Sequence, residues 1–343
     1  DKVNKLGKPA RITFKVGGTI LVQSGLRLDA PNATLDGSTA PAPGITLSGR
    51  DIMKFLFDED GFLKQPISRT RRAFKPGAIR AHRGPLFGIG KVENVIVRDI
   101  RFRETPSLNL HLAGGAKRIL FDHISSTECG DGALFINNGA ELVTVQWSIF
   151  AGCNLCVRTR GDKVSFHHCL FAENAMRNPL ARGDGVRDLR NNVVVGWRVA
   201  GIQSVEGESP KLNIINSFWS PPAGAKEVGR VLDIRGSSTI YARGNVGPEG
   251  FDWNAKSNTG SPLPEPPVTT QTAEEAKALV LKYAGARPRD EIDRGYADGT
   301  RKYVSRTKDE WRSAAPWWTK EKPPPPPKFI PDWTKEAPEE EKE

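Results

Sequence analysis

One pattern of apolar and polar positions recurs along the middle of this 343-residue chain at intervals of about two dozen residues. Seven segments share it: Val95–Phe102, Ile119–Ser126, Val143–Phe150, Val164–Phe171, Asp188–Val195, Leu212–Trp219 and Thr239–Val246. Their first residues are separated by 24, 24, 21, 24, 24 and 27 positions. A near-constant period of this length is typical of a solenoid, in which short units stack and share one core.

The residues within each unit favour strands over helices. Helical repeats need Ala, Leu, Glu and Lys at 3.6-residue spacing, whereas these units are rich in Val, Ile and Phe, several with period-two alternation. Gly and Asn lie between the units, where turns require them. At about 3.3 Å per strand residue, such a period accommodates about three short strands and three turns. The pattern therefore predicts an all-β fold in which each period is one coil of a parallel β-helix.

Alternation along each unit also predicts which side chains point into the core. The expected inward residues are Val95, Val97, Ile119, Phe121, Val143, Val145, Val164 and Phe166. His168, Asn192 and Asn216 are spaced by 24 residues, so we expect them to stack as a structural polar ladder.

Residues 1–300 are predicted to form one β-helix domain. Within it, residues 11–49 have the alternation of early coils, whereas residues 51–90 break the period. We interpret residues 51–90 as an insertion between coils. It is either a flap over a groove or a solvated excursion, and the sequence does not separate the two.

The C-terminal part of the chain leaves the repeat. Thr272 and Glu275 form a capping box before a short amphipathic helix, expected at about residues 272–285. Residues 301–343 form a Pro-rich charged tail whose five consecutive prolines favour polyproline II over a packed core. The tail is therefore interpreted as a linker or an interaction arm.

The formal net charge of +10 is either a solubility charge or a sign of a polyanionic partner, such as an acidic polysaccharide or a nucleic acid. No zinc-finger spacing, helix-turn-helix spacing or RNP-like aromatic motif is present in the sequence, which disfavours nucleic acid. No run of 18 apolar residues predicts a membrane span. We expect a monomer that is secreted or periplasmic, with a signal peptide that is not part of this sequence.

Two of the four cysteines are spaced by one coil. Cys129 and Cys153 are 24 residues apart, so stacking would place them about 4.8 Å from each other, within the range of a disulfide. A stack of buried thiols fits the same spacing, and both alternatives stay open. Cys153 and Cys156 lack the second pair of ligands that a structural zinc site needs.

Four arginines are the first candidates for binding chemistry. Arg177 and Arg182 surround a proline in a turn, where two fixed guanidinium groups suit carboxylates. Arg158 and Arg160 follow the preceding core strand, and Arg182 lies 24 and 22 residues beyond them. Stacking therefore predicts a basic strip on one side of the solenoid; a solvated face is the alternative.

A second group of polar side chains lies between positions 122 and 131. Asp122 and His123 are followed by Glu128 and Asp131. A turn hydrogen bond explains Asp122 and His123 without any catalytic role. A β-helix glycoside hydrolase would instead need two of the carboxylates of Asp122, Glu128 and Asp131 about 5–9.5 Å apart, and they look scattered for that purpose.

With these features in view, the sequence resembles the pectate lyase family, specifically the right-handed parallel β-helix of polysaccharide lyase family 1. The stretches that carry the resemblance are, in chain order, Gly17–Ile20, Asn32–Pro41, Gly44–Leu47, Asn94–Arg103, Ile119–His123, Val143–Trp147, Phe166–His168, Arg177–Pro179, Thr270–Glu275 and Ala284–Asp290. Their order is more specific than any one of them. The resemblance implies a right-handed coil and β-elimination on an acidic polyuronate.

The resemblance also assigns roles to single residues. It makes Arg177 the expected Brønsted base and Arg182 a ligand of a substrate carboxylate. Arg158, Arg160 and His123 are further candidates for substrate binding. Cationic groups would neutralise the uronate carboxylate, acidify the C5–H bond and stabilise the developing enolate.

Calcium is the cofactor that the resemblance implies. Asp131 falls where the family has a calcium-ligand aspartate, with Asn109 and Glu128 as further candidates for a weak Ca²⁺ site. Asn109 stands where the family has another aspartate, and Phe135 where some members have a further acid. These departures leave a non-catalytic polyuronate-binding β-helix as an alternative to the lyase.

Overall fold

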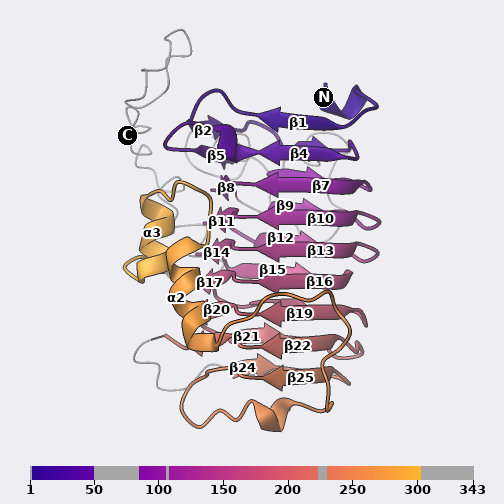
Figure 1. The fold of residues 1–343 in the computed structure, drawn as a ribbon, viewed down its shortest axis with the longest axis vertical. Helices are drawn as coiled ribbons and strands as arrows, with labels where there is room; N and C mark the ends of the chain where they lie inside the picture. Colours follow the sequence, from indigo (N-terminus) through magenta and orange to yellow (C-terminus); the bar gives the residue numbers. More distant parts are fainter. Residues whose placement is uncertain (1, 50–84, 106–107, 223–229, 303–343) are drawn as a thin grey trace, which may run out of the picture.

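The computed structural model describes residues 2–49, 85–105, 108–222 and 230–302. These residues form a right-handed parallel β-helix with two short α-helices along one side (Figure 1), which confirms the predicted fold class. Every pair of neighbouring strands runs parallel, and each coil contributes one strand to each of three sheets.

Sheet A forms the front of the molecule in Figure 1 and has nine strands. They are β1 (Ala10–Thr13), β4 (Ala33–Asp36), β7 (Glu93–Arg98), β10 (Lys117–Asp122), β13 (Glu141–Gln146), β16 (Asp162–His167), β19 (Val186–Arg190), β22 (Lys211–Ile215) and β25 (Thr239–Arg243). Sheet B has eight strands. They are β2 (Gly18–Leu21), β5 (Ile45–Ser48), β8 (Ile100–Arg103), β11 (Ser125–Thr127), β14 (Ile149–Ala151), β17 (Leu170–Ala172), β20 (Val193–Val195) and β23 (Phe218–Ser220).

Sheet C also has eight strands and positions the candidate site. They are β3 (Leu26–Leu28), β6 (Phe87–Ile89), β9 (Leu108–Leu112), β12 (Gly132–Ile136), β15 (Leu155–Thr159), β18 (Leu180–Ala181), β21 (Ala200–Gln203) and β24 (Arg230–Asp233). The helical elements are η1 (Val3–Lys5), η2 (Gly37–Thr39), η3 (Asn254–Lys256), α2 (Ala273–Tyr283) and α3 (Glu291–Asp298).

The core runs along the axis of the coils. All eight side chains predicted to point inward are at most 1% exposed and belong to one cluster, which confirms that prediction. Because each coil buries its apolar face only against its neighbours, the cluster is continuous from the first coils to Trp253.

Each repeated segment contains a bend that the sequence pattern did not reveal. In the first six segments the first half lies in sheet A and the second half in sheet B, with one residue of positive φ between them. These bend residues are Asp99, His123, Trp147, His168, Asn191 and Asn216, and Gly244 has the corresponding positive φ after β25 in the seventh segment. A single left-handed residue turns the strand without a loop, at a conformational cost that the stacked neighbours offset.

Two repeats were predicted a residue out of register. Val164 pairs with Arg187, and Arg187 pairs with Leu212, so the fifth unit begins at Arg187 and the prediction of Asp188 as its first residue is wrong. Leu212 in turn pairs with Ile240, so the seventh unit begins at Ile240 rather than at Thr239. Arg187 is fully buried at a position where the pattern expects an apolar side chain, which explains the first of these errors.

The same shift changes the predicted polar ladder. Asn191, rather than Asn192, aligns with Asn216 and donates from Nδ2 to its carbonyl oxygen at 2.9 Å. Asn192 lies one position later and accepts from the backbone N–H of Cys169 at 2.9 Å. Asn192 was therefore the wrong member of the ladder.

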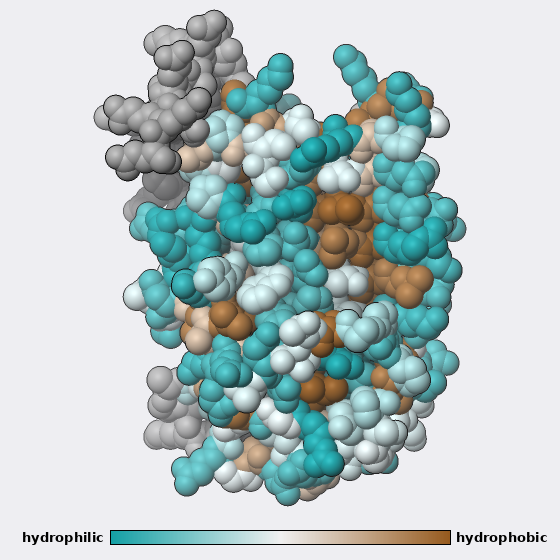
Figure 2. Space-filling model, in the orientation of Figure 1, coloured by the Kyte–Doolittle hydropathy of each residue, from teal (hydrophilic) through white to brown (hydrophobic). Residues whose placement is uncertain are grey.

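The predicted C-terminal helix is confirmed. Helix α2 begins after a capping box in which Thr272 and Glu275 satisfy each other's backbone N–H groups. Before it, the chain crosses the front of sheet A, where Leu263 and Asn213 exchange hydrogen bonds of 2.9 and 3.0 Å (Figure 1). Figure 2 shows hydrophobic side chains at the surface over the other, N-terminal half of this face.

Helices α2 and α3 cover sheet B. Val280 and Tyr296 pack with Ile149, Leu170 and Val193 in a second apolar cluster. Beneath α3, buried ionic groups join the helix to the sheet.

Two arginines of β8 bind two aspartates of the α3 region. Arg103 donates to Asp290 and to Asp293 at 2.5 Å each, and Arg101 lies 3.4 Å from both carboxylates. Ser125 of β11 donates to Asp293 at 2.7 Å. We call these five residues the C-terminal clasp, because they fasten α3 to sheet B.

All four cysteines are buried and are present as thiols. The Sγ atoms of Cys129 and Cys153 lie 2.7 Å apart, so the two residues are stacked neighbours, as their spacing of one coil predicts. Most of the predicted insertion, residues 51–84, and the tail from residue 303 lie outside the described residues, whereas β6 already belongs to sheet C. No helix within the described ranges is long and apolar enough to span a membrane.

Candidate active site

Three of the predicted arginines line one pocket on sheet C. Arg158 lies in β15, and Arg160 and Arg182 directly follow β15 and β18, which pair in register. The pocket has a volume of about 290 Å³ and is lined by Gly114, Asn137, Asn138, Arg158, Arg160 and Arg182. The structure therefore brings these arginines together, with Arg182 in line with Arg160 rather than with Arg158.

Arg177 lies beside this pocket, in the turn before β18. Its backbone N–H donates to Gln203 Oε1 at 3.1 Å, and its carbonyl accepts from Val157 N at 2.9 Å. Burial lowers the pKa of Arg177, and the nearby charges of Arg158 and Arg182 lower it further, against the opposing effect of Asp131. The site thus makes this guanidinium easier to deprotonate than an exposed one.

Asp131, directly before β12, is the acidic member of this group. Burial raises the pKa of the Asp131 carboxyl, and the charges of Arg177 and Arg158 oppose that rise. These mutual effects show that Asp131, Arg158 and Arg177 lie close enough to interact electrostatically.

Arg158 is held by contacts that the sequence did not predict. Its guanidinium lies 4.2 Å from the ring centre of Phe135, a cation–π distance, and donates to Asn137 Oδ1 at 3.1 Å. Phe135 and Arg158 are register partners in β12 and β15, so a spacing of one coil was the signal for this pair.

Glu208 is the second contact that sequence reasoning missed. Its carboxylate accepts from Arg182 Nη2 at 2.8 Å and from Arg182 Nε at 3.2 Å. The backbone N–H of Gly183 donates to it at 2.6 Å, and Arg160 Nη2 lies 3.4 Å away. Glu208 follows Arg182 by about one coil, but a glutamate in a loop gives no pattern to recognise.

Arg187 supports the same turn from inside the core. Its guanidinium donates to the carbonyl oxygens of Thr159, Arg182 and Gly185. Burial lowers its pKa to about 10. An interior arginine bonded to three carbonyl groups fixes the backbone on which Arg160 and Arg182 stand.

Three other predicted site residues lie elsewhere. Asn109 is fully buried, and its amide donates to the carbonyls of Phe102 and Thr127 at 2.9 and 3.0 Å. The Glu128 carboxylate pairs with Arg301, with 2.7 Å to Nε. His123 lies in the bend between β10 and β11, 2.7 Å from Asp122. The structure does not gather these three side chains around the arginine pocket.

The donor set does not fit a calcium site built from protein carboxylates. Ca²⁺ takes six to eight oxygen ligands, and the described part of the chain contains no group of three Asp, Glu, His or Cys side chains that could hold a metal ion. Asn109 and Glu128 already use their polar atoms within the protein. Phe135, beneath Arg158, offers no oxygen ligand.

The carboxylates of the hydrolase alternative belong to three different sheets. Asp122 ends β10 of sheet A, Glu128 follows β11 of sheet B, and Asp131 precedes β12 of sheet C. Such an arrangement does not favour two carboxylates across one glycosidic bond.

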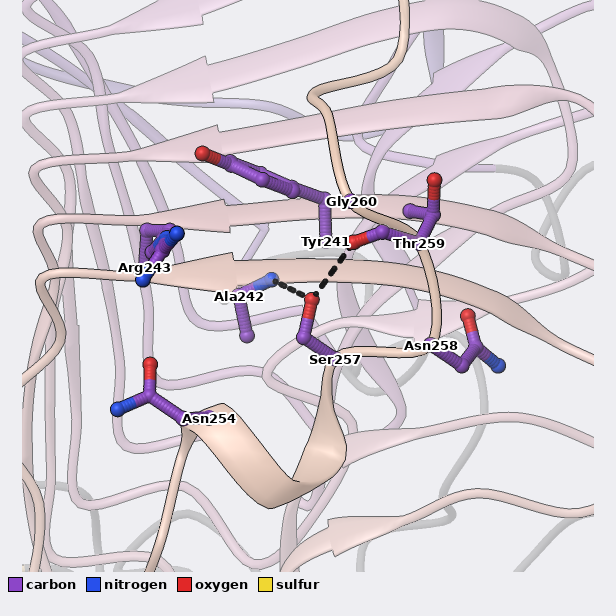
Figure 3. A pocket seen from close by; sticks show the side chains of 8 residues that line it. All are labelled: Tyr241, Ala242, Arg243, Asn254, Ser257, Asn258, Thr259 and Gly260. Atoms are coloured by element: carbon purple, nitrogen blue, oxygen red, sulfur yellow. Dashed lines mark hydrogen bonds between the residues drawn. The ribbon is translucent and has the colours of Figure 1, made fainter.

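A second pocket, of about 480 Å³, lies at the C-terminal end of the β-helix (Figure 3). Its walls are Tyr241, Ala242, Arg243, Asn254, Ser257, Asn258, Thr259 and Gly260. Ser257 Oγ accepts from Ala242 N at 3.3 Å, and Arg243 is the charged residue of the lining. Although it is larger, this pocket lacks the cluster of charged groups that marks the arginine pocket.

Comparison with known proteins finds relatives along most of the chain. This chain is 27% identical over 321 residues to probable pectate lyase C of Neosartorya fischeri, and the aligned region covers 82% of this chain and 64% of that protein. Probable pectate lyase C of Aspergillus fumigatus is 28% identical over 322 residues, with the same coverage. The chain therefore spans 64% of the length of these curated relatives. No family model matches it.

Solved structures share the fold. A pectate lyase from Bacillus sp. N165 in complex with trigalacturonate matches with a TM-score of 0.55 at 16% identity, covering 83% of this chain and 89% of that one. The major allergen from cedar pollen matches with a TM-score of 0.59 at 16% identity, covering 81% of each chain. The sequence and fold comparisons together confirm the resemblance to pectate lyases.

Proposed function

Because this chain is similar to pectate lyases in sequence and in fold, we propose that the protein is a polysaccharide lyase that cleaves an acidic, pectate-like polyuronate by β-elimination. The observation that carries the proposal is the arginine cluster on sheet C, in which Arg158, Arg160 and Arg182 line one pocket. Half-buried Arg177 and Asp131 interact electrostatically with this cluster. The curated relatives are named pectate lyases, and a structural neighbour binds trigalacturonate.

In the proposed reaction Arg177, in its neutral form, removes the C5 proton of a uronate residue. The electron pair of the C5–H bond becomes the C4–C5 double bond. The C4–O bond breaks with its electron pair on the glycosidic oxygen, which takes a proton from water. The product carries an unsaturated uronate at its new non-reducing end.

An arginine base needs a lowered pKa, because a free guanidinium has a pKa of about 12.5 or more. Burial and two neighbouring cations act in that direction on Arg177. Geometry and charge therefore support the same residue that the sequence resemblance selected.

Arg158, Arg160 and Arg182 would bind the uronate carboxylates. A cation beside the carboxylate withdraws charge from the C5–H bond and stabilises the enolate that forms as the proton leaves. The stacking of Arg158 on Phe135 and the support of Arg182 by Glu208 keep these groups in place before substrate binds. His123 remains a prediction for substrate binding that its contacts do not support.

We retain calcium in the proposal only as an ion that Asp131 and substrate carboxylates would bind together. Asp131 is the predicted ligand that lies in the site. If Ca²⁺ binds there, it would supply further neutralisation of the uronate carboxylate. We further propose that the protein is a secreted or periplasmic monomer whose partner is the polysaccharide.

The test measures the ultraviolet absorbance of unsaturated uronate formed from polygalacturonate, with added Ca²⁺ and with excess chelator. Rising absorbance supports elimination, whereas new reducing ends without absorbance show hydrolysis. Binding of polygalacturonate without either product supports the non-catalytic alternative, which the poor calcium donor set favours. Affinity that is equal in low and high salt, or equal for a neutral glucan, contradicts a basic binding strip.

A further inference from the structure

Glu208 places a carboxylate on the guanidinium that the proposed function assigns to substrate. Two nitrogens of Arg182 donate to it, at 2.8 and 3.2 Å, in the bidentate geometry that arginine uses for carboxylates. The Glu208 side chain is 14% exposed and contacts Arg182, which itself lines the pocket. A uronate carboxylate would present the same two oxygens to the same nitrogens.

The surrounding contacts show that this position is built for an anion. The backbone N–H of Gly183 donates to Glu208 at 2.6 Å, and Arg160 Nη2 lies 3.4 Å from it. Burial raises the pKa of Glu208, but the hydrogen bonds from Arg182 and Gly183 outweigh this and lower it. Two arginines and one amide therefore surround a single ionised carboxylate.

Glu208 lies in the connection between β21 and β22. It follows β21 in a turn with Gly207 at φ +76°, and Ser204 anchors the start of that turn by exchanging hydrogen bonds of 2.7 Å with Arg235. Glu208 itself is bonded only to the arginine turn among the contacts given by the described residues. Its displacement from Arg182 would break those contacts.

We propose that Glu208 is an internal stand-in for a uronate carboxylate, which occupies Arg182 in the free protein and must be displaced by the substrate. This inference rests on the proposed function, because it takes a polyuronate as the ligand of the arginine pocket. Glu208 thereby sets how tightly the pocket holds anions. It keeps Arg182 in position while the pocket is empty and weakens the retention of the anionic product.

The test compares the wild type with Glu208→Gln, which keeps the size of the side chain and removes its charge. Asp184→Asn is the matched control, because it removes one negative charge at an exposed position from the turn that carries Arg182. Arg182→Ala and the Arg182→Ala/Glu208→Gln double variant complete a cycle. Calorimetry measures trigalacturonate binding, and ultraviolet absorbance measures kcat and KM on polygalacturonate.

Glu208→Gln is expected to bind trigalacturonate about tenfold more tightly, since a charge-assisted competitor is lost. Its KM should fall by a similar factor, whereas Asp184→Asn should change affinity less than about twofold. The gain should vanish in the Arg182→Ala background. A merely structural glutamate would give weaker binding on replacement, not tighter.

Unchanged or weaker binding by Glu208→Gln overturns the inference, as does a gain that Asp184→Asn or the Arg182→Ala background reproduces. The proposed function fails separately. If every variant binds trigalacturonate in the expected order but none forms unsaturated product, the stand-in role holds and the lyase is refuted. If the wild type binds no trigalacturonate in low salt, the substrate assignment and the inference fall together.

Discussion

Replacing Asp293 by alanine is expected to detach α3 from the β-helix. Asp293 is fully buried and accepts from Arg103 at 2.5 Å and from Ser125 at 2.7 Å, with Arg101 3.4 Å away. Both arginines are at most 4% exposed. Alanine would leave them with Asp290 as their remaining carboxylate in the C-terminal clasp.

The expected cost is large because the remaining charges stay buried. Removing one partner of a buried ion pair costs about 3–5 kcal/mol, mostly from the charge left behind. Total stabilities of single domains are about 5–15 kcal/mol, and a docked terminal element opens at a lower free energy than the whole fold. The substitution should therefore undock the C-terminal helices while the coils of the β-helix stay folded.

Hydrogen exchange measures this directly, with protection of residues 284–302 compared with protection of the central strands. Glu291→Ala is the control, because it removes an exposed carboxylate from the first turn of the same helix. Asp293→Asn, which keeps the shape, should lie between the two. Protection of α3 in Asp293→Ala that equals the control would refute the clasp as the main attachment of this helix.

The C-terminal clasp should also lose its stabilising effect at low pH. Although burial opposes the shift, hydrogen bonds and charge from Arg103 lower the pKa of Asp290 from 3.8 to about 2. A carboxylate with a lowered folded-state pKa stabilises the fold above the unfolded value and loses that contribution as pH falls. Protection of α3 should therefore decline between about pH 4 and pH 2.

Four further predictions follow from the site and the core. Arg177→Lys should keep the fold and lower turnover about 10²–10⁴-fold, because lysine keeps the charge but not the planar group. The control Arg118→Lys, at an exposed position, should leave turnover unchanged, and wild-type-like turnover of Arg177→Lys would exclude Arg177 as the base. Calorimetry should find no saturable Ca²⁺ binding to the protein alone below about 10⁻³ M, and tight binding would contradict the donor-set argument. Iodoacetamide should label no cysteine of the folded protein, because all four are buried, and should label four after unfolding without reductant; two would instead indicate a Cys129–Cys153 disulfide. Burial and the charge of Asp188 raise the pKa of Glu265 from 4.5 to about 7, so the fold should lose stability as pH rises through that range. Thermal unfolding of Glu265→Gln should not show this loss.

The fold was readable from the sequence because stacking repeats one physical requirement in every coil. Val95, Ile119, Val143 and Val164 occupy the same inward position, so a simple period predicts them. The error at Arg187 has the opposite cause, because a buried arginine that bonds backbone carbonyls breaks the apolar pattern while still filling the core. Pattern reasoning assumes that inward positions are apolar.

The candidate site was readable only in part. Arg158, Arg160 and Arg182 meet because they are spaced by about one coil, which the sequence shows. Glu208 could not be found in this way, since its carboxylate reaches Arg182 from a loop whose path depends on tertiary structure. Asn109 and Glu128 were expected as metal ligands from resemblance alone; Asn109 bonds backbone carbonyls of β8 and β11, and Glu128 pairs with Arg301.

The segment that forms the pocket at the end of the β-helix also limits association between molecules. Strand β25 is the last of sheet A, and its outer edge would otherwise offer free backbone groups to another chain. Asn258 Oδ1 accepts from Ile240 N at 2.7 Å, Asn258 N donates to the carbonyl of Ile240 at 2.9 Å, and Ser257 occupies the N–H of Ala242. Residues 254–260 thus cap the outer edge of β25 and end the ladder of backbone hydrogen bonds. A chain that lost them would present an open template, on which second copies could add end to end and grow into fibres.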